Sequence, residues 1–274
     1  MAGDAVEDLE LRLLLEGIYQ RYGYDFREYA RSSIRRRVWR RVAEEGLETL
    51  SGLQERILHD PACMERLLLD LSINVTSMFR DPSFYAALRE TVVPLLATYP
   101  FARVWCAGCS SGEEVLSVAI LLEEEGLYDR ARVYATDLNE QVLARARVGV
   151  FPLERMRQYT RNYQRASGRR DFSGYYTAAY GAAQFSRSLL ENVVFAQHDL
   201  AADGAFNEFH LILCRNVMIY FDKPLQNRVH GLFHESLAPF GVLGLGHKES
   251  ISFTPYADRY EELDGGQRLY RKLR

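Results

Sequence analysis

The amino-acid sequence predicts a small all-helical domain followed by an α/β domain built on a parallel sheet. Before position 100, apolar residues recur at helical spacing and no segment shows the alternation of a strand. After position 100, short apolar runs alternate with helical segments, which is the pattern of a doubly wound parallel sheet. The chain has 274 residues, of which 47% are hydrophobic, so it is long enough to bury a core.

The N-terminal part is predicted to contain helices joined by short turns. Pro61 suits the first turn of one of them, and Gly46 suits the end of another. The spacing predicts helices at about 9–19, 33–45, 50–58 and 61–71. We therefore expect a helical domain over 1–72 and an inter-domain segment over 73–95.

The remainder, 96–274, is expected to form the α/β domain. Its predicted strands are 103–106, 131–137, 192–196, 210–214 and 241–246, with an edge strand at 267–273. Its predicted helices are 113–125, 139–147 and 223–237. Residues from about 159 to 190 are rich in Arg, Tyr, Ser and Gly and fit neither pattern. We expect an inserted β-subdomain there, because a structureless loop of that length is uncommon.

Composition excludes several classes of protein. The formal net charge of −3 argues against a protein that coats nucleic acid. No run approaches the roughly 18 apolar residues of a membrane span. The acidic N-terminus has no secretion signal. We expect a cytoplasmic protein that does not insert into a membrane.

Four cysteines are too few for a disulfide scaffold. Cys106 and Cys109 form a C-x-x-C pair, which suits redox chemistry, half of a zinc site, or small residues in a tight loop. We favour the last interpretation and expect no metal, because no second pair of ligands matches the first.

The stretch 104–114 connects a predicted strand to a predicted helix, where open α/β sheets bind ligands. Gly108 and Gly112 allow close approach of the backbone. Glu113 would repel a pyrophosphate but suits a ligand with an amino group, and Asp137 can accept hydrogen bonds from ribose hydroxyls. Each acid alone also suits a helix start or a turn. Together they favour S-adenosyl-L-methionine.

Five segments carry a family resemblance, in the family's order. They are N-V-T-S-M-F-R-D at 74–81, the glycine loop ending in G-E-E at 104–114, A-T-D-L at 135–138, C-R-N-V-M-I-Y-F at 214–221 and G-L-G-H at 244–247. The chain thereby resembles the CheR family of chemotaxis receptor methyltransferases. It departs from the family's usual residues at Met78, Asp199 and Lys248.

The resemblance implies a Rossmann-like class I methyltransferase domain that binds S-adenosyl-L-methionine and releases S-adenosyl-L-homocysteine. The implied cofactor residues are Asn74, Thr76, Arg80, Gly108, Glu113, Asp137, Asp199, Leu200, Asn216 and Val217. Arg80 and Tyr220 are the implied catalytic residues, Arg80 to orient the substrate carboxylate and Tyr220 to face the methyl group. Simpler interpretations remain open: Arg80 as a partner of Asp81, Asn216 as a turn residue and Tyr220 as a core aromatic residue.

The resemblance further implies methyl transfer to glutamate side chains of receptors. A glutamate is already an anion at neutral pH, so the reaction needs no general base. The enzyme's task is in-line positioning with water excluded. The sequence leaves two alternative functions. A nucleic-acid methyltransferase is disfavoured, because the D/N-P-P-Y/F motif is missing. A non-catalytic cofactor-binding module remains the other alternative.

Residues 31–41 contain six arginines and no acid. On a helix, Ile34, Val38 and Val42 form an apolar face. Arg36 and Arg40 point to the opposite side, and Arg37 and Arg41 flank them. We expect this basic face to attract the acidic methylation helices of receptors. A solvated helix and a nucleic-acid surface are the alternatives, although we expect no nucleic-acid partner. We expect a monomer, and the inserted subdomain is a candidate dock for a receptor tail peptide.

Overall fold

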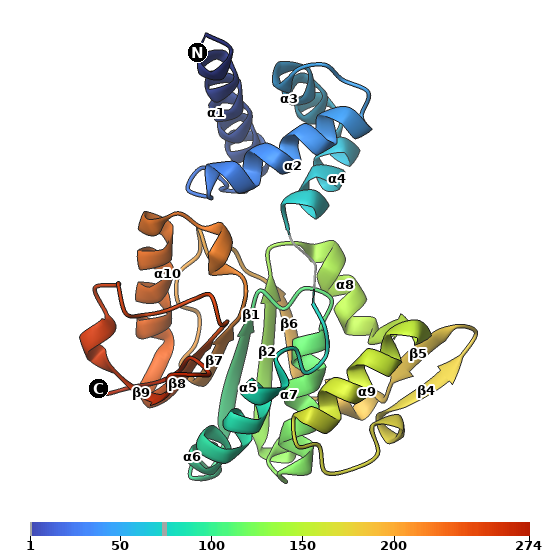
Figure 1. The fold of residues 1–274 in the computed structure, drawn as a ribbon, viewed down its shortest axis with the longest axis vertical. Coiled ribbons are helices and arrows are strands. Elements are labelled where there is room, and N and C mark those ends of the chain that lie inside the picture. The colour runs from blue at the N-terminus through green and yellow to red at the C-terminus, as the bar shows by residue number, and fades with distance from the viewer. Residues whose placement is uncertain (1, 73–75) are drawn as a thin grey trace. The chain divides into compact units, whose positions relative to one another are not determined.

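The computed structural model describes residues 2–72 and 76–274 (Figure 1). It divides the chain into two compact units. The helical unit comprises Met1–Ile73, Asp199–Asp203 and Tyr220–Val229. The α/β unit comprises Asn74–His198, Gly204–Ile219 and His230–Arg274. Among the described residues, no helix is both long enough and apolar enough to cross a membrane.

The helical unit contains the helices that the sequence predicts. They are α1 (Ala2–Tyr22), α2 (Arg31–Glu44), α3 (Leu50–His59) and α4 (Pro61–Leu71). Thr49 caps α3 by accepting a hydrogen bond from the Gly52 amide, and Asp60 caps α4 in the same way. The predicted apolar face of α2 is confirmed, because Ile34, Val38 and Val42 are buried.

A seven-stranded mixed sheet forms the centre of the α/β unit, in the order β6-β2-β1-β7-β8-β10-β9 (Figure 1). The strands are β1 (Ala102–Ala107), β2 (Ala131–Asp137), β6 (Val193–Gln197), β7 (Phe209–Cys214), β8 (Leu237–Leu245), β9 (Tyr260–Asp264) and β10 (Leu269–Lys272). The first five strands in this order, β6-β2-β1-β7-β8, pair in parallel. Strand β10 is antiparallel to both its neighbours, β8 and β9. The chain proceeds from β1 to one side and later returns to β7 on the other. The carboxyl ends of β1 and β7 therefore flank the switch point, where such sheets bind ligands.

Helices connect these strands and cover the sheet. They are α5 (Pro82–Ala87), a π-helical turn η1 (Leu88–Val92), α6 (Val93–Ala97), α7 (Glu113–Glu124), α8 (Glu140–Val148) and α10 (Lys223–Ser236). Helix α7 is buried along most of its length. Because it begins directly after the glycine loop, its packing fixes the position of that loop.

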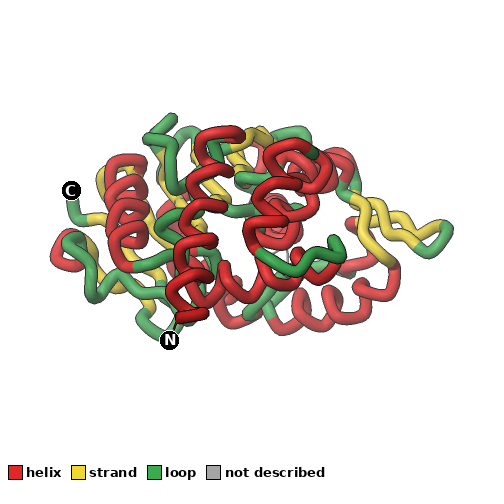
Figure 2. The backbone as a smooth tube through the Cα atoms, turned by 90° about the horizontal axis from the view of Figure 1, so that it is seen from above, coloured by secondary structure: helices red, strands yellow, loops and turns green. Residues whose placement is uncertain are grey.

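A small antiparallel sheet, with the order β3-β5-β4, makes up the inserted subdomain. Its elements are β3 (Val150–Pro152), α9 (Met156–Arg165), β4 (Tyr176–Ala179) and β5 (Ala182–Phe185). The sequence predicts its start at about 159, but β3 extends the subdomain back to about 150. The sequence of β3, Val-Phe-Pro, is too short to show the apolar pattern from which a strand is predicted. Figure 2 shows the β4–β5 hairpin extending away from the large sheet.

Candidate active site

The glycine loop after β1 packs tightly against the loop after β7 and against helix α8. Gly108 and Gly112 have φ of +73° and +93°, which other residues rarely adopt. A Cβ atom on Gly108 would lie 2.5 Å from Val217 Cγ2, and one on Gly112 would lie 2.9 Å from Ala146 Cβ. The amides of Gly108 and Cys109 both donate to the Thr136 carbonyl at 2.8 Å. Only glycine fits at these two points, because a side chain would collide with Val217 or Ala146. The predicted close approach of this backbone to a ligand stays a prediction.

Asp137 ends β2 and faces the same loop. Its Oδ2 accepts a hydrogen bond from the Ser110 amide at 2.9 Å, and its Oδ1 accepts one from the Asn139 amide at 3.0 Å. Burial raises the pKa of Asp137, while these amides oppose the shift. A carboxylate has about four acceptor positions, so each oxygen can still accept a hydroxyl. The geometry suits the pair of hydroxyls of a ribose.

Glu113, the first residue of α7, is enclosed. Its side chain has 0% exposure. Oε1 accepts hydrogen bonds from the Tyr159 hydroxyl at 3.0 Å and from Arg155 Nη1 at 3.2 Å, and Oε2 accepts one from Ser111 Oγ at 2.6 Å. These partners tie the start of α7 to the inserted subdomain. The carboxylate presents no surface to a ligand in this conformation.

Its neighbour Glu114 is more accessible. The side chain is 14% exposed, and its Oε2 accepts a hydrogen bond from Arg215 Nη1 at 3.2 Å. Burial raises the pKa of Glu114, against the opposing positive charges of Arg215 and Arg80. The sequence prediction places the amino-group contact at Glu113, whereas Glu114 has the more exposed side chain. Adjacent helical residues point about 100° apart, so the motif alone does not distinguish the two.

Arg80 lies in a constrained turn. Phe79 and Asp81, on either side of it, have φ of +48° and +57°. Arg215 Nη2 donates to the Arg80 carbonyl at 3.0 Å and to Asp81 Oδ2 at 2.7 Å. The Phe79 amide donates to Ser117 Oγ of α7 at 2.9 Å. The turn therefore presents Arg80 from a rigid support. Asp81 binds Arg215 through Oδ2, and the interpretation in which Arg80 pairs with Asp81 stays an alternative.

The loop after β7 contains Val217 and Asn216, which has a φ of +62°. Glu249, which sequence reasoning missed, binds this loop. Its carboxylate accepts hydrogen bonds from the amides of Asn216 and Val217, both at 2.9 Å, and from Gly246 at 2.7 Å. Asn216 Oδ1 is buried and has no hydrogen-bond partner among the described residues. The only sequence signal for Glu249 was its place after the G-L-G-H element.

Two family models match nearly the whole chain. The CheR methyltransferase SAM-binding domain matches residues 74–264, and the CheR methyltransferase all-alpha domain matches residues 9–72. The chain belongs to the CheR methyltransferase family. Cher3 of Pseudomonas putida is 53% identical over 272 residues, covering 99% of this chain and 100% of that protein. A chemotaxis protein methyltransferase of Salmonella typhimurium is 31% identical over 262 residues, covering 90% of this chain and 86% of that protein.

This CheR methyltransferase is therefore an enzyme that uses S-adenosyl-L-methionine, on the fold that the sequence predicts. The α/β unit fits that cofactor. Asp137 retains acceptor capacity for the ribose, and Glu114 offers a partly exposed carboxylate for an amino group. The orphaned acceptor Asn216 Oδ1 suits a donor such as the adenine amino group.

The set of site residues just described does not include every residue that the sequence predicts for this CheR methyltransferase. Asn74 is outside the described residues, and Thr76 is half-buried. Asp199, Leu200 and Tyr220 belong to the helical unit, so their roles toward the cofactor stay predictions. Asp199 Oδ1 accepts a hydrogen bond from the Ala201 amide at 2.8 Å. Asp199 Oδ2 is buried without a partner in the described part of the chain.

The basic helix α2 is less exposed than the sequence suggests. Arg37 is 5% exposed, donates to the Leu71 carbonyl and lies 4.9 Å from the centre of the Tyr220 ring. Arg41 is 9% exposed and pairs with Asp70 at 2.5 Å. The guanidinium groups of both arginines therefore bind partners within the helical unit.

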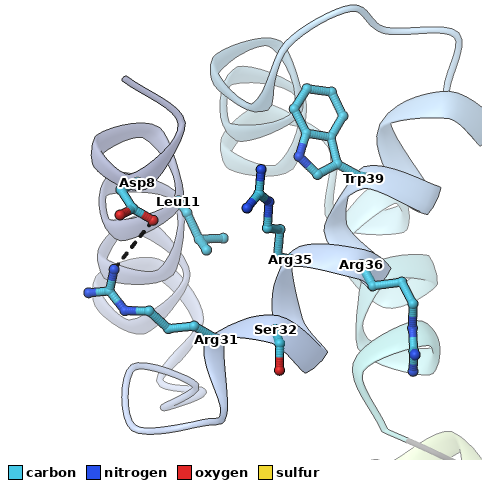
Figure 3. A pocket seen from close by; sticks show the side chains of 7 residues that line it. All are labelled: Asp8, Leu11, Arg31, Ser32, Arg35, Arg36 and Trp39. Carbon is cyan, nitrogen blue, oxygen red and sulfur yellow. Dashed lines mark ion pairs between the residues drawn. The ribbon is translucent and has the colours of Figure 1, made fainter. Parts of the chain in front are cut away.

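The exposed arginines of α2 differ in their partners. Arg40 pairs with Glu44 at 3.6 Å and also with Asp70. Arg36 is exposed, and Figure 3 shows it pointing away from the pocket between α1 and α2 that it helps to line. On the other side of that pocket, Arg31 pairs with Asp8 at 3.5 Å (Figure 3). Arg36 is thus an exposed member of the predicted basic face, and its role toward a partner stays a prediction.

The cysteines are all buried free thiols. Burial raises the pKa of Cys106 and Cys109 well above the ordinary value, which suppresses the reactive thiolate. Within residues 2–72 and 76–274, no three or more His, Cys, Asp or Glu side chains are gathered as a metal site would need. Cys106 in β1 and Cys109 in the glycine loop are thus buried side chains, and the interpretation as small packing residues stays a prediction.

Proposed function

We propose that this CheR methyltransferase transfers the methyl group of S-adenosyl-L-methionine to glutamate side chains of chemoreceptors or related sensory proteins, forming methyl esters. The observation that carries the proposal is the match of both domains to the CheR models over 9–72 and 74–264. A relative with both domains is named a chemotaxis protein methyltransferase. Such a substrate faces the cytoplasm, where we propose that the enzyme acts as a monomer.

We propose a cofactor site built on four points of the α/β unit. Asp137 binds the ribose and Glu114, in place of Glu113, binds the amino group of the methionine moiety, because only Glu114 has exposed surface. Asn216 and Val217 contact the adenine. The family resemblance adds Asn74, Thr76, Asp199 and Leu200 to this set.

The proposed mechanism is a direct displacement. The cofactor supplies an electrophilic methyl group on a positively charged sulfur. A carboxylate oxygen of the substrate forms the new bond to carbon as the carbon–sulfur bond breaks and its electron pair passes to sulfur. No proton moves, so no base is needed. Arg80 orients the carboxylate from its rigid turn, because a guanidinium matches carboxylate geometry, and Tyr220 lines the path of the methyl group.

Two surfaces are proposed for the receptor. Arg36 on α2 is an exposed cation that would attract an acidic methylation helix. The inserted subdomain offers β4, which is the edge strand of the small sheet and pairs with β5. Its residues 177–179 are exposed. An extended receptor tail peptide could add to this edge as a further strand, with main-chain hydrogen bonds supplying affinity.

The test is methyl transfer from radiolabelled S-adenosyl-L-methionine to membranes that contain candidate receptors. Label on a receptor-sized band that is released as methanol in alkali supports a glutamate ester. Alkali-stable label would show nitrogen or carbon methylation and contradict the proposal. Binding of the cofactor without label on any receptor would favour the non-catalytic alternative.

A further inference from the structure

The carboxylate of Glu249 is placed where three backbone amides converge. It accepts hydrogen bonds from Asn216 and Val217 after β7 and from Gly246 after β8, at 2.7 to 2.9 Å. The residue is 5% exposed. A buried charge is costly unless several donors compensate it, so an acid at this point is stable only because the two loops converge on it.

The Glu249 carboxylate and the Asn216 backbone can approach Gly246 closely because this residue has no side chain. A Cβ atom there would lie 2.7 Å from Glu249 Oε2, 2.8 Å from the Asn216 amide nitrogen and 2.9 Å from Asn216 Nδ2. The Glu249 amide in turn donates to the Gly246 carbonyl at 2.8 Å. The segment Gly246–Glu249 thus forms a hydrogen-bonded turn, and the Glu249 carboxylate binds the backbone of the loop after β7.

The loop that Glu249 holds has two consequences for the cofactor site. Asn216 is kept at φ +62°, a conformation that an isolated asparagine adopts only at a cost. Val217 is pressed against the glycine loop, since its Cγ2 lies 2.5 Å from the position a Gly108 Cβ would take. Glu249 therefore acts on both the loop after β7 and, through Val217, the loop after β1.

We propose that Glu249 is a positioning residue for cofactor binding, which orders the Asn216–Val217 loop by capturing its backbone amides. The proposal rests on the proposed contact of Asn216 and Val217 with the adenine. Glu249 itself touches no reacting atom. Its loss should therefore weaken the binding of cofactor and product without altering the chemistry of bound substrates.

The experiment compares Glu249→Gln with wild type and with Glu235→Gln, a matched change at an exposed glutamate of α10. The dissociation constant for S-adenosyl-L-homocysteine is measured by calorimetry. We expect E249Q to raise it at least tenfold and E235Q to leave it within twofold. Glu249→Asp keeps the charge and should recover part of the loss. A folded E249Q variant that binds the product within threefold of wild type would overturn the proposal.

Two further readouts separate positioning from a general loss of structure. At saturating S-adenosyl-L-methionine, E249Q should keep kcat within threefold of wild type while KM for the cofactor rises. A fall in kcat with an unchanged KM would contradict the proposal. In the ligand-free wild type, the amides of Asn216, Val217 and Gly246 should exchange hydrogen as slowly as those of β7 and β8. Fast exchange there would contradict the proposal even if E249Q failed to fold.

Asn216→Ala distinguishes failure of this inference from failure of the proposed site. If N216A weakens binding of the product and E249Q does not, the loop contacts the cofactor but Glu249 does not position it. If neither variant weakens binding, the adenine assignment of the loop also fails. Neither result depends on which protein is methylated, so the proposed glutamate substrate is tested separately.

Discussion

Glu113 and Glu114 are adjacent in α7 but differ in accessibility, and the proposed contact with the amino group rests on this difference. Glu113 is enclosed by Tyr159, Arg155 and Ser111, whereas Glu114 retains exposed surface. We predict that Glu114→Gln weakens binding of S-adenosyl-L-homocysteine at least tenfold, because a charged hydrogen bond to the ammonium group is lost. Glu113→Gln should change the dissociation constant less than threefold and act mainly on the melting temperature.

Binding of 5′-methylthioadenosine, which lacks the amino-acid moiety, is the control for this prediction. E114Q should bind it as wild type does, because the lost contact is absent from that ligand. Equal weakening for both ligands would mean that the site is generally disturbed. A strong effect of E113Q confined to S-adenosyl-L-homocysteine would return the role to Glu113.

Arg80 is expected to contribute to the rate of methyl transfer, measured as kcat. Its turn is fixed by Arg215, so a change of side chain should leave the backbone in place. We predict that Arg80→Ala lowers kcat by about a hundredfold, which is typical when a positioning contact to the reacting group is removed. Arg80→Lys should recover little, since an ammonium lacks the paired donors of a guanidinium.

Single-turnover rates with preformed enzyme–cofactor complex check the prediction for Arg80. The dissociation constant for the product is measured beside them. Near-normal turnover in R80A would remove the orienting role. A large loss of affinity with a normal single-turnover rate would instead assign Arg80 to cofactor binding alone.

At the scale of elements, the arginines of α2 fall into two groups that the sequence did not separate. Helical spacing correctly placed Ile34, Val38 and Val42 inside. It could not foresee that Arg37 and Arg41 lie near the same face, because their partners Leu71 and Asp70 come from α4, some thirty residues away. Contacts between distant segments are decided by packing, which periodicity does not encode.

This division predicts different outcomes for two matched substitutions. Arg36→Ala should raise the KM for receptor and reduce its dependence on salt, with little effect on stability, because the side chain is exposed. Arg41→Ala should lower the free energy of unfolding by about 2 kcal/mol, since Asp70 loses a buried partner. Methylation kinetics at two salt concentrations and urea unfolding of both variants check this. Equal effects of the two substitutions on KM would contradict it.

The inserted subdomain shows another limit of the sequence. Its aromatic and basic residues are fastened to the far end of α7, where Glu124 accepts hydrogen bonds from Tyr175 at 2.9 Å and from the Arg169 amide at 3.0 Å. Tyr163 and Arg89 also bind Glu124. A cluster of tyrosines without periodicity indicated only that something was inserted there. Glu124, the acid that binds these residues, lies in α7, outside the inserted subdomain.

At the scale of the whole molecule, the fold was largely predictable and the detail of the site was not. Strand β2 and helices α7 and α10 lie within a residue of their predicted bounds, because apolar runs and helix signals mark them. Strand β8 begins at Leu237 instead of about 241, since it directly follows α10 without a turn signal. Strand β9 reads Y-E-E-L-D and was not predicted, because an acidic edge strand carries no apolar pattern.

The site follows the same division. Asp137 and Gly108 could be identified because strand ends and glycine loops carry local signals. The roles proposed for Glu114 and Glu249 could not be predicted, because they depend on Arg215 and on backbone amides brought together by folding. The family resemblance supplied Asn216 and Val217, whereas the structure supplies the acid that orders them.

The measurement that tests the central claim most directly is the location of the transferred methyl group. A receptor cytoplasmic fragment is incubated with the enzyme and S-adenosyl-L-methionine, digested and sequenced by tandem mass spectrometry, with R80A as the negative control. The account predicts one added methylene mass on glutamate side chains of the fragment, lost on mild alkaline treatment and strongly reduced with R80A. A methyl group on lysine, arginine or a terminal amine, or one that survives alkali, would contradict it.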